Sequence, residues 1–190
     1  MEIKFLQELR NKIDQRIKDL ETPNTNIMRT GKKGLDLIKS FEGIHDGDLR
    51  KIGLQPKMDP VGIWTEGWGR VMRDSKGNFL KGSANKDYAE KNATIHTNDD
   101  ADKALANDIR TYETIVERKV SVPLTQNQFD ALVSHTYNTG GSGTLFNLIN
   151  KKASAKEIRT WFETKYITSQ GVKLNGLIRR RKAEADLYFS

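Results

Sequence analysis

Two carboxyl groups and one hydroxyl group are spaced along the chain as a hydrolytic site requires. Glu42 lies at the end of an apolar helical pattern, while Asp59 and Thr65 stand six residues apart in a glycine-rich segment, about the length of a turn and a return strand. A carboxylic acid that faces a carboxylate holding a water molecule is the arrangement that hydrolyses glycosidic bonds. A proton donor needs a partly desolvated site, which Glu42 beside Phe41 suits. Asp59 suits the ionised partner, and the Thr65 hydroxyl could share its water.

The same residues also fit a purely structural interpretation. A glutamate at a helix end is often only solvated or paired, and Asp-Pro followed by glycine is common turn chemistry. Strand alternation puts Thr65 and Gly67 on one face, so Glu66 is expected to point away from Thr65. The residues alone therefore leave a catalytic and a structural interpretation open.

The segments around these residues predict an α+β protein with two unequal lobes. Apolar residues on one face predict a helix from about residue 30 to Gly43, and glycine-punctuated residues 43–82 predict a small antiparallel sheet. Asn98, Thr125 and Ser154 are suitable N-caps, the last two within capping boxes. The helices expected after the sheet span about 98–120, 126–138, 155–166 and 175–189.

The first 30 residues are predicted to be a separate unit. An apolar stripe with steps of three and four runs from Ile3 to Leu20, which predicts an amphipathic helix, and residues 21–26 are rich in turn formers and form a linker. This extra N-terminal helix is expected to pack on the main domain or on a second copy of the chain, which would make a homodimer. Residues 31–190 are the expected catalytic domain.

The composition excludes several kinds of chemistry. The chain has 190 residues, no cysteine and three histidines, so disulfides, thiol nucleophiles and cysteine-ligated zinc are excluded, and we expect no cofactor and no metal. His45, Asp46 and Asp48 are close enough in sequence to bind a metal, but a solvated turn is the preferred interpretation. The sequence has neither the long apolar stretch of a membrane span nor a secretory signal pattern, so we expect cytoplasmic synthesis and no membrane insertion.

The net charge of +7 favours a polyanionic partner. Residues 121–190 carry ten Lys and Arg against five Asp and Glu, so most of the excess lies in the predicted helical lobe. Nucleic acid, an anionic membrane and an acidic cell-wall polymer fit this charge equally well. The sequence shows neither a helix-turn-helix motif nor a basic stripe interleaved with aromatic residues, which argues against a nucleic-acid partner.

Five motifs, in this order, resemble those of the bacteriophage-type lysozymes, glycoside hydrolase family 24. They cover about residues 31–189 and are Leu37-Ile-Lys-Ser-Phe-Glu42-Gly, Asp59-x5-Thr65-x-Gly67-x-Gly69, Leu124-Thr-Gln-Asn-Gln-Phe-Asp-Ala-Leu-Val133, Tyr137-Asn138-Thr-Gly140 and Gly176-Leu-Ile-Arg-Arg-Arg-Lys-Ala-Glu184. The resemblance implies a lysozyme-like fold, with a substrate cleft between a small β lobe and a larger helical lobe. It also implies a muramidase that cleaves the β-1,4 bond between N-acetylmuramic acid and N-acetylglucosamine in peptidoglycan. Such an enzyme is expected to act after its release from the cytoplasm, in the host periplasm or outside the cell.

The resemblance further implies roles for single residues. Glu42 is expected to be the general acid, while Asp59 and Thr65 position the water for a reaction with inversion. Asn138 is expected either to bind a polar group of the sugar or to have a structural role at the C-terminus of its helix. Arg180, in preference to its neighbour Arg179, is expected to reach Glu42 and to contribute to the substrate site.

Departures from the family pattern support an alternative function. The loop from Gly43 to Met58 is longer than expected and carries Asp46 and Asp48 as rival carboxylates, and Arg70 stands where relatives often have histidine. The alternative is a catalytically impaired lysozyme-like module that only binds the cell wall. His135 and Trp161 are expected to pack inside the helical lobe instead of taking part in catalysis or sugar stacking.

Overall fold

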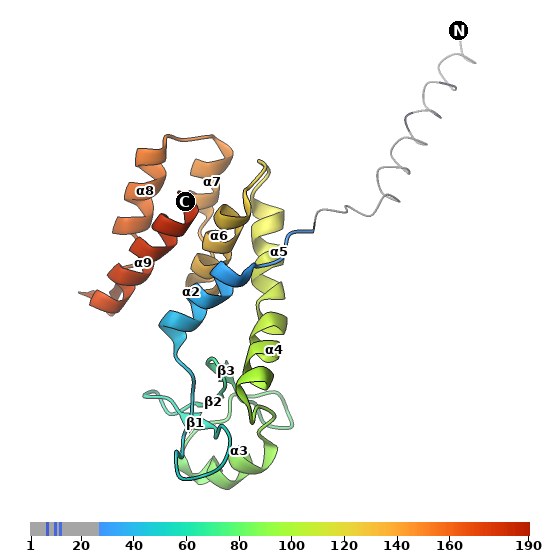
Figure 1. Cartoon of the computed structure of the whole chain (residues 1–190), viewed down its shortest axis with the longest axis vertical. Coiled ribbons are helices and arrows are strands. Elements are labelled where there is room, and N and C mark those ends of the chain that lie inside the picture. Colours follow the sequence, from blue (N-terminus) through green and yellow to red (C-terminus); the bar gives the residue numbers. More distant parts are fainter. Residues whose placement is uncertain (1–6, 8–9, 11, 13–26) are drawn as a thin grey trace.

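The computed structural model describes Gln7, Arg10, Lys12 and residues 27–190. The described main body has a helical lobe and a smaller lobe that carries the sheet, joined by α4 (Asn98–Asp108) and by the segment after α2 (Lys32–Glu42) (Figure 1). The predicted α+β class with two unequal lobes is confirmed. The predicted amphipathic helix and linker lie outside the described residues except at these few positions, and the homodimer predicted from that helix stays a prediction.

Helix α2 carries Glu42 as its last residue. Its N-terminus is held by α6 (Gln126–Thr139), because the Asp130 carboxylate accepts from the backbone N–H of Gly31 at 2.9 Å and of Gly34 at 3.1 Å. The helix ends at Gly43, whose φ of +69° suits glycine. Ile38, on the face toward the helical core, is fully buried. The predicted helix and its end are therefore confirmed.

The small lobe contains a three-stranded antiparallel sheet, as predicted. Strands β1 (Lys57–Met58), β2 (Trp64–Glu66) and β3 (Arg70–Val71) lie in the order β1-β2-β3, and Lys57 pairs with Thr65. Residues 78–80, within the segment predicted as sheet, are not a strand, but Phe79 bridges to Arg73 and Leu80 N donates to Met72 O at 3.0 Å. The 3-10 helix η1 (Ser83–Asn85) and helix α3 (Lys86–Asn92) complete the lobe and were not predicted.

The single helix predicted over 98–120 is two helices. Helix α4 and helix α5 (Arg110–Lys119) meet at the buried Ile109, where no glycine or proline marks the break in the sequence. The predicted N-cap Asn98 is also wrong by one residue. The Thr97 side chain accepts from Asp100 N and the Asp100 side chain accepts from Thr97 N, so the capping box starts one residue earlier.

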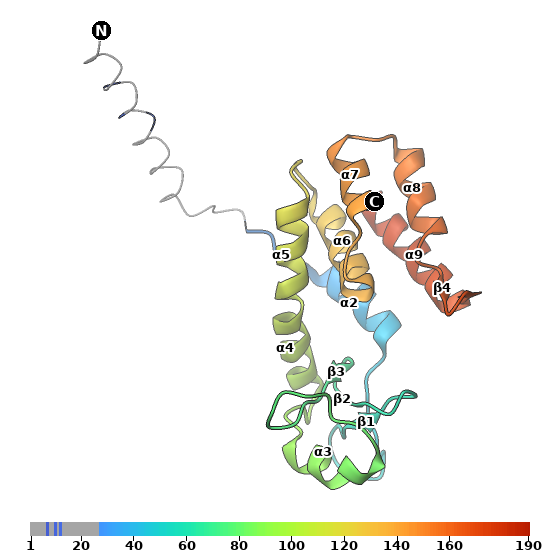
Figure 2. The same ribbon diagram turned by 180° about the vertical axis from the view of Figure 1, so that it is seen from behind.

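Helix α6 forms the centre of the helical lobe, and its residues 129–136 are all buried. Helices α8 (Ala155–Thr164) and α9 (Asn175–Tyr188) pack beside it, and the capping boxes of α6 and α8 are present as predicted. Helix α7 (Gly143–Asn150) and the hairpin of β4 (Thr168–Ser169) and β5 (Val172–Lys173) were not predicted. Seen from behind, this hairpin projects from the end of the helical lobe that faces the sheet (Figure 2).

His135 and Trp161 pack in the core of the helical lobe, as predicted. The His135 ring meets Trp161 and Phe162 edge to face, with centroids 5.3 and 5.7 Å away. Burial, and then the positive charges of Arg181 and Arg180, lower the pKa of His135 to about 3. Among the described residues, no helix combines the length and the apolar character that crossing a membrane requires.

Candidate active site

An arginine on α9 holds the carboxyl group of Glu42. Arg180 Nη1 donates to Glu42 Oε1 at 2.6 Å, and the Arg180 guanidinium lies 5.6 Å from the ring centroid of Phe41. The side chain of Arg180 is only 4% exposed, whereas that of Glu42 is 25% exposed. Arg179 is exposed to solvent. The predicted contact therefore exists and involves Arg180, while part of the Glu42 side chain stays exposed.

A buried polar cluster lies behind this pair. Glu184 is fully buried and its Oε1 accepts from Arg180 Nε at 3.2 Å, from Arg181 Nη2 at 3.0 Å and from Ser134 Oγ at 2.9 Å. Arg180 thus bridges two carboxylates on different helices, Glu42 on α2 and Glu184 on α9. Such charge-assisted bonds fix the orientation of Arg180, and through it that of the Glu42 carboxyl group.

Asp59 is oriented by the turn between β1 and β2. Its Oδ1 accepts from the backbone N–H of Val61 at 3.0 Å and of Ile63 at 2.8 Å. The backbone of the turn is closed by two further bonds, from Asp59 N to Ile63 O at 2.8 Å and from Gly62 N to Asp59 O at 3.0 Å. The carboxylate is thus fixed by its own turn, and Oδ2 takes part in none of these bonds.

Thr65 lies next to this turn on β2 and is almost fully buried. Its Oγ1 is 2.5 Å from His45 Nδ1 and 3.0 Å from the carbonyl oxygen of Lys57. Burial, followed by the charge of Lys57, lowers the pKa of His45, while the charges of Glu42 and Asp59 act in the opposite direction. His45 therefore contacts Thr65 and lies within electrostatic range of both carboxylates.

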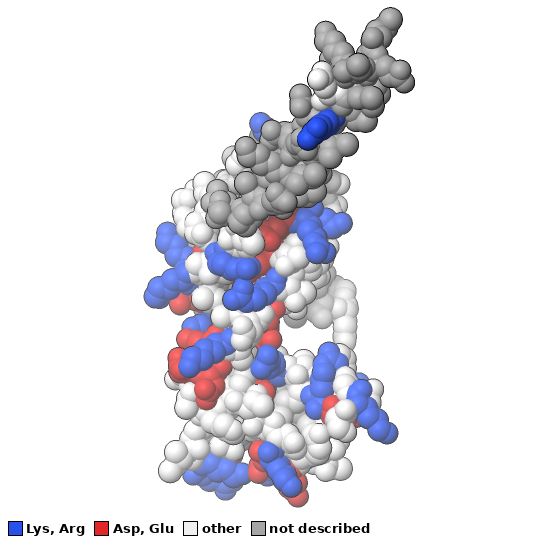
Figure 3. Space-filling model, turned by 90° about the vertical axis from the view of Figure 1, so that its right-hand side faces the viewer, with Lys and Arg blue, Asp and Glu red and all other residues white. Residues whose placement is uncertain are grey.

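The aromatic residues behind Glu42 tie the two lobes together. Asp102 of α4 accepts from Lys39 Nζ at 2.6 Å and from Trp68 Nε1 at 2.7 Å, and the Tyr137 hydroxyl donates to Trp68 O at 3.5 Å. Burial, and then the nearby negative charge of Glu42, raise the pKa of Tyr137. Figure 3 shows a hollow between the upper and lower parts of the molecule on one face.

The rival polar residues have other partners. Asp46 accepts from backbone N–H groups of its own loop, and Asp48 pairs with Arg50 at 2.9 Å. Glu66 is buried and accepts from the backbone of Thr94 and Ile95, which confirms its separation from Thr65. Among the described residues, no group of three potential ligands is arranged to hold a metal ion.

Comparison with known proteins decides the family. The phage lysozyme family model matches residues 40–184. The chain belongs to the phage lysozyme family. It is 28% identical over 170 residues to the endolysin of Acyrthosiphon pisum secondary endosymbiont phage 1, covering 86% of this chain and 99% of that protein. It also spans between 55% and 60% of the length of four other curated endolysins.

Solved structures agree with this assignment. The endolysin from Escherichia coli O157:H7 phage FAHEc1 superposes with a TM-score of 0.64 at 30% identity, covering 86% of this chain and 94% of that chain. The muramidase domain of SpmX from Asticaccaulis excentricus superposes with a TM-score of 0.63 at 28% identity, over 85% of this chain and 98% of that chain. The protein is thus a glycoside hydrolase of the lysozyme type, with a lysozyme fold, that acts on peptidoglycan.

The side chains of Arg70 and Asn138 each have a polar partner in this lysozyme. Arg70, which stands at the position of the expected histidine, pairs with Asp108 at 2.9 Å and so links β3 to α4. Asn138 is exposed near the end of α6, and its Oδ1 accepts from Arg181 Nη2 at 2.9 Å. Gly140, with a φ of +80°, ends that helix, so the C-cap is not Asn138.

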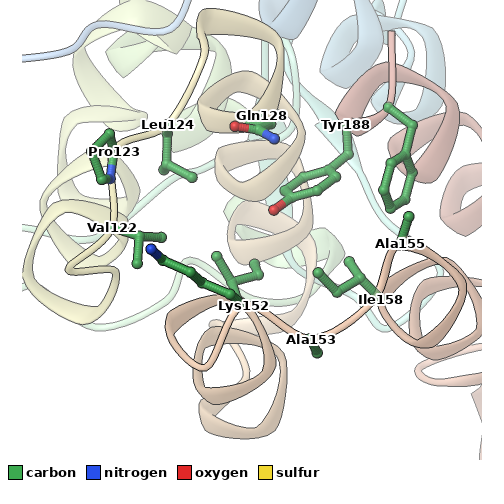
Figure 4. A pocket seen from close by; sticks show the side chains of 11 residues that line it. Val122, Pro123, Leu124, Gln128, Lys152, Ala153, Ala155, Ile158 and Tyr188 are labelled. Atoms are coloured by element: carbon green, nitrogen blue, oxygen red, sulfur yellow. The ribbon is translucent and has the colours of Figure 1, made fainter.

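A separate cavity of about 450 Å³ lies among α6, α7, α8 and α9, away from Glu42 (Figure 4). Val122, Leu124 and Ile158 are among its apolar lining residues, with Gln128, Lys152 and Tyr188 as polar groups. Its lining, which lies wholly in the described part of the chain, contains no carboxyl group. It therefore lacks the acid that glycoside hydrolysis needs.

The contact of His45 with Thr65 is a feature of the candidate site that the sequence did not predict. His45 lies 20 positions from Thr65, and the local sequence indicates only a turn residue or a potential metal ligand there. Its backbone bridges to Gly67, with His45 N donating to Gly67 O at 2.7 Å. Nothing local in the sequence signals this bridge, because the intervening loop has to fold back onto the sheet.

Proposed function

We propose that this lysozyme hydrolyses the β-1,4 bond between N-acetylmuramic acid and N-acetylglucosamine, with Glu42 as the general acid. The observation that carries the proposal is the position of the carboxyl group, which Arg180 orients at 2.6 Å while leaving part of it exposed. The electrostatic influence of both Glu42 and Asp59 on His45 supports a site that contains both carboxyl groups.

In this mechanism the Glu42 carboxylic acid gives its proton to the glycosidic oxygen as the bond to the anomeric carbon breaks. Asp59 accepts a proton from a water molecule that attacks the anomeric carbon from the opposite face, and the Thr65 hydroxyl helps to hold that water. The product keeps the new hydroxyl group on the face of attack, which inverts the anomeric configuration.

Two more residues support the substrate site. Arg180 is almost fully buried, so we assign it a positioning role that acts on the substrate through Glu42. The amide of Asn138 is exposed, and the bond from Arg181 fixes its direction at the end of α6. We assign this amide to a polar group of the sugar, such as an N-acetyl oxygen.

We further propose that the protein acts on the host cell wall after release from the cytoplasm, in the periplasm or outside the cell. The excess positive charge of residues 121–190 supports association with a wall polymer that carries muramic-acid and peptide carboxylates. Neither a metal nor a cofactor is needed for the proposed steps, because two carboxyl groups and a water supply all the protons.

The proposal is tested with Glu42→Gln, which keeps the shape but removes the acid. We expect the initial rate of reducing-end release from purified peptidoglycan to fall by at least about a hundredfold. Glu117→Gln, at an exposed glutamate of α5, is the matched control and is expected to keep the wild-type rate.

Mass spectrometry of the fragments identifies the cleaved bond and the new end group. Full activity of Glu42→Gln would contradict the mechanism. Binding of walls by the wild-type protein without release of fragments would instead support the wall-binding module.

A further inference from the structure

His45 lies at the junction of the proposed catalytic groups. Its Nδ1 is 2.5 Å from Thr65 Oγ1, and its backbone N–H donates to Gly67 O at 2.7 Å. The backbone bond ties the start of the long loop to the end of β2, and the ring contact is directed at the hydroxyl. His45 is therefore fixed at two points beside Thr65.

The second partner of Thr65 sets the direction of these hydrogen bonds. Thr65 Oγ1 lies 3.0 Å from the carbonyl oxygen of Lys57, which can only accept. A hydroxyl has one hydrogen to donate, so when that hydrogen goes to Lys57, His45 Nδ1 must carry a hydrogen and donate it to Thr65. The hydroxyl oxygen then keeps one lone pair that can accept a further hydrogen.

We propose that His45 is a positioning residue that holds the Thr65 hydroxyl as a hydrogen-bond acceptor for the attacking water. The inference rests on the hydrolytic mechanism proposed above. The water directs one hydrogen to Asp59 and the other to Thr65, which leaves a lone pair of its oxygen aimed at the anomeric carbon. His45 neither gives a proton to the substrate nor takes one from the water.

The hydrogen bond from His45 Nδ1 to Thr65 does not depend on whether the ring is charged. Lys57 on β1 opposes protonation of His45, whereas Glu42 on α2 and Asp59 in the turn favour it. Because burial also lowers its pKa, His45 is neutral at pH 7. In acid it gains a proton on Nε2 without losing the Nδ1 hydrogen, so it still donates to Thr65.

Three substitutions at this position separate the role of Nδ1 from simple packing. His45→Asn places an amide N–H near the position of Nδ1, His45→Gln places one near Nε2, and His45→Leu has none. We expect His45→Asn to keep kcat within about threefold, and the other two to lose about tenfold in kcat with little change in KM. His96→Leu, at an exposed histidine of the same lobe, is the control for loss of an imidazole.

A double substitution tests the mechanism directly. In a Thr65→Val background, His45→Leu is expected to cause no additional loss of kcat.

Wild-type kcat in His45→Leu, or equal kcat in the Asn and Gln variants, would overturn the inference. Failure of the inference is distinguishable from failure of the proposed function. If Glu42→Gln is inactive and His45→Leu is fully active, only the role of His45 is wrong. If Glu42→Gln is active, the hydrolytic mechanism itself is wrong.

Discussion

The two sides of the proposed active site are held by different kinds of contact. On the helical side, the Glu42 carboxyl group depends on Arg180, a residue 138 positions away in the chain and almost fully buried. On the sheet side, the Asp59 carboxylate depends on backbone N–H groups no more than four positions away. Loss of a long-range buried contact that orients a catalytic side chain is expected to lower both activity and stability. A side chain that is oriented by its own turn can be changed with loss of activity alone. The substitutions below test this difference.

Loss of Arg180 is expected to have the largest effect. Arg180→Leu leaves the carboxyl groups of Glu42 and Glu184 without their shared cation, and breaking a buried pair in this way costs about 3–5 kcal/mol of unfolding free energy. Denaturant unfolding measures this loss, and activity is expected to fall with it. Arg179→Leu, one residue earlier and exposed, is expected to change the unfolding free energy by less than about 0.5 kcal/mol. Equal losses of unfolding free energy in Arg180→Leu and Arg179→Leu would show that the buried contacts of Arg180 do not set it apart from an exposed arginine.

Asp59→Asn is expected to reduce activity without reducing stability. The amide oxygen can still accept from Val61 and Ile63, so the turn survives, but the base is lost and kcat is expected to fall about a hundredfold. Asp74→Asn is the control, because Asp74 accepts from the backbone of Lys76 and Asn78 in a similar turn. A fall in the thermal midpoint as large as that of Arg180→Leu would show that this side, too, couples activity to stability.

His135 is expected to make the helical side sensitive to acid. Its pKa is lowered to about 3 in the fold, from 6.5 when unperturbed, so below pH 6.5 the unfolded chain binds a proton that the folded chain does not. Stability is therefore expected to fall by about 2 kcal/mol from pH 7 to pH 5. His135→Phe keeps an aromatic ring beside Trp161 and is expected to lose less stability over this range. An unchanged pH dependence would argue against a neutral His135.

The smallest effect is expected from surface charge. Lys151 and Lys152 lie in the turn between α7 and α8, and Lys156 lies in the first turn of α8. This turn is at the end of the helical lobe farthest from the sheet (Figures 1 and 2). Replacing all three by Gln is expected to weaken wall association about two- to threefold at low salt and to reduce its salt dependence. The matched control carries the same change at three exposed lysines of the small lobe, namely Lys76, Lys81 and Lys91.

The control is expected to change the salt dependence less, because residues 31–120 have nearly balanced charge, with 16 Lys and Arg against 15 Asp and Glu. Equal salt profiles in the two triple variants would contradict a preference of the wall polymer for the helical lobe. Neither variant is expected to change the kcat of soluble fragments.

Local signals in the sequence predicted the parts of the fold that short segments decide. The capping boxes at Thr125 and Ser154 begin helices where expected, and Gly43 ends the helix that carries Glu42. The break at Ile109 was missed because no glycine or proline marks it, whereas helix α7 has a local signal in its N-cap Ser142, whose side chain accepts from Leu145 N. In the segment predicted as sheet, Phe79 and Lys81 form isolated bridges, to Arg73 and to Ile63, instead of a strand.

The sequence by itself determined which residues the site can use, because helix ends, turns and six-residue spacings are set by nearby residues. It placed Glu42 at a helix end and put Asp59 and Thr65 on one hairpin. Only the tertiary structure decided between Arg179 and Arg180, which point about 100° apart on α9, so that packing against α2 selects one. It also decided that His45 contacts Thr65, because a loop must fold back across the sheet to bring the two together.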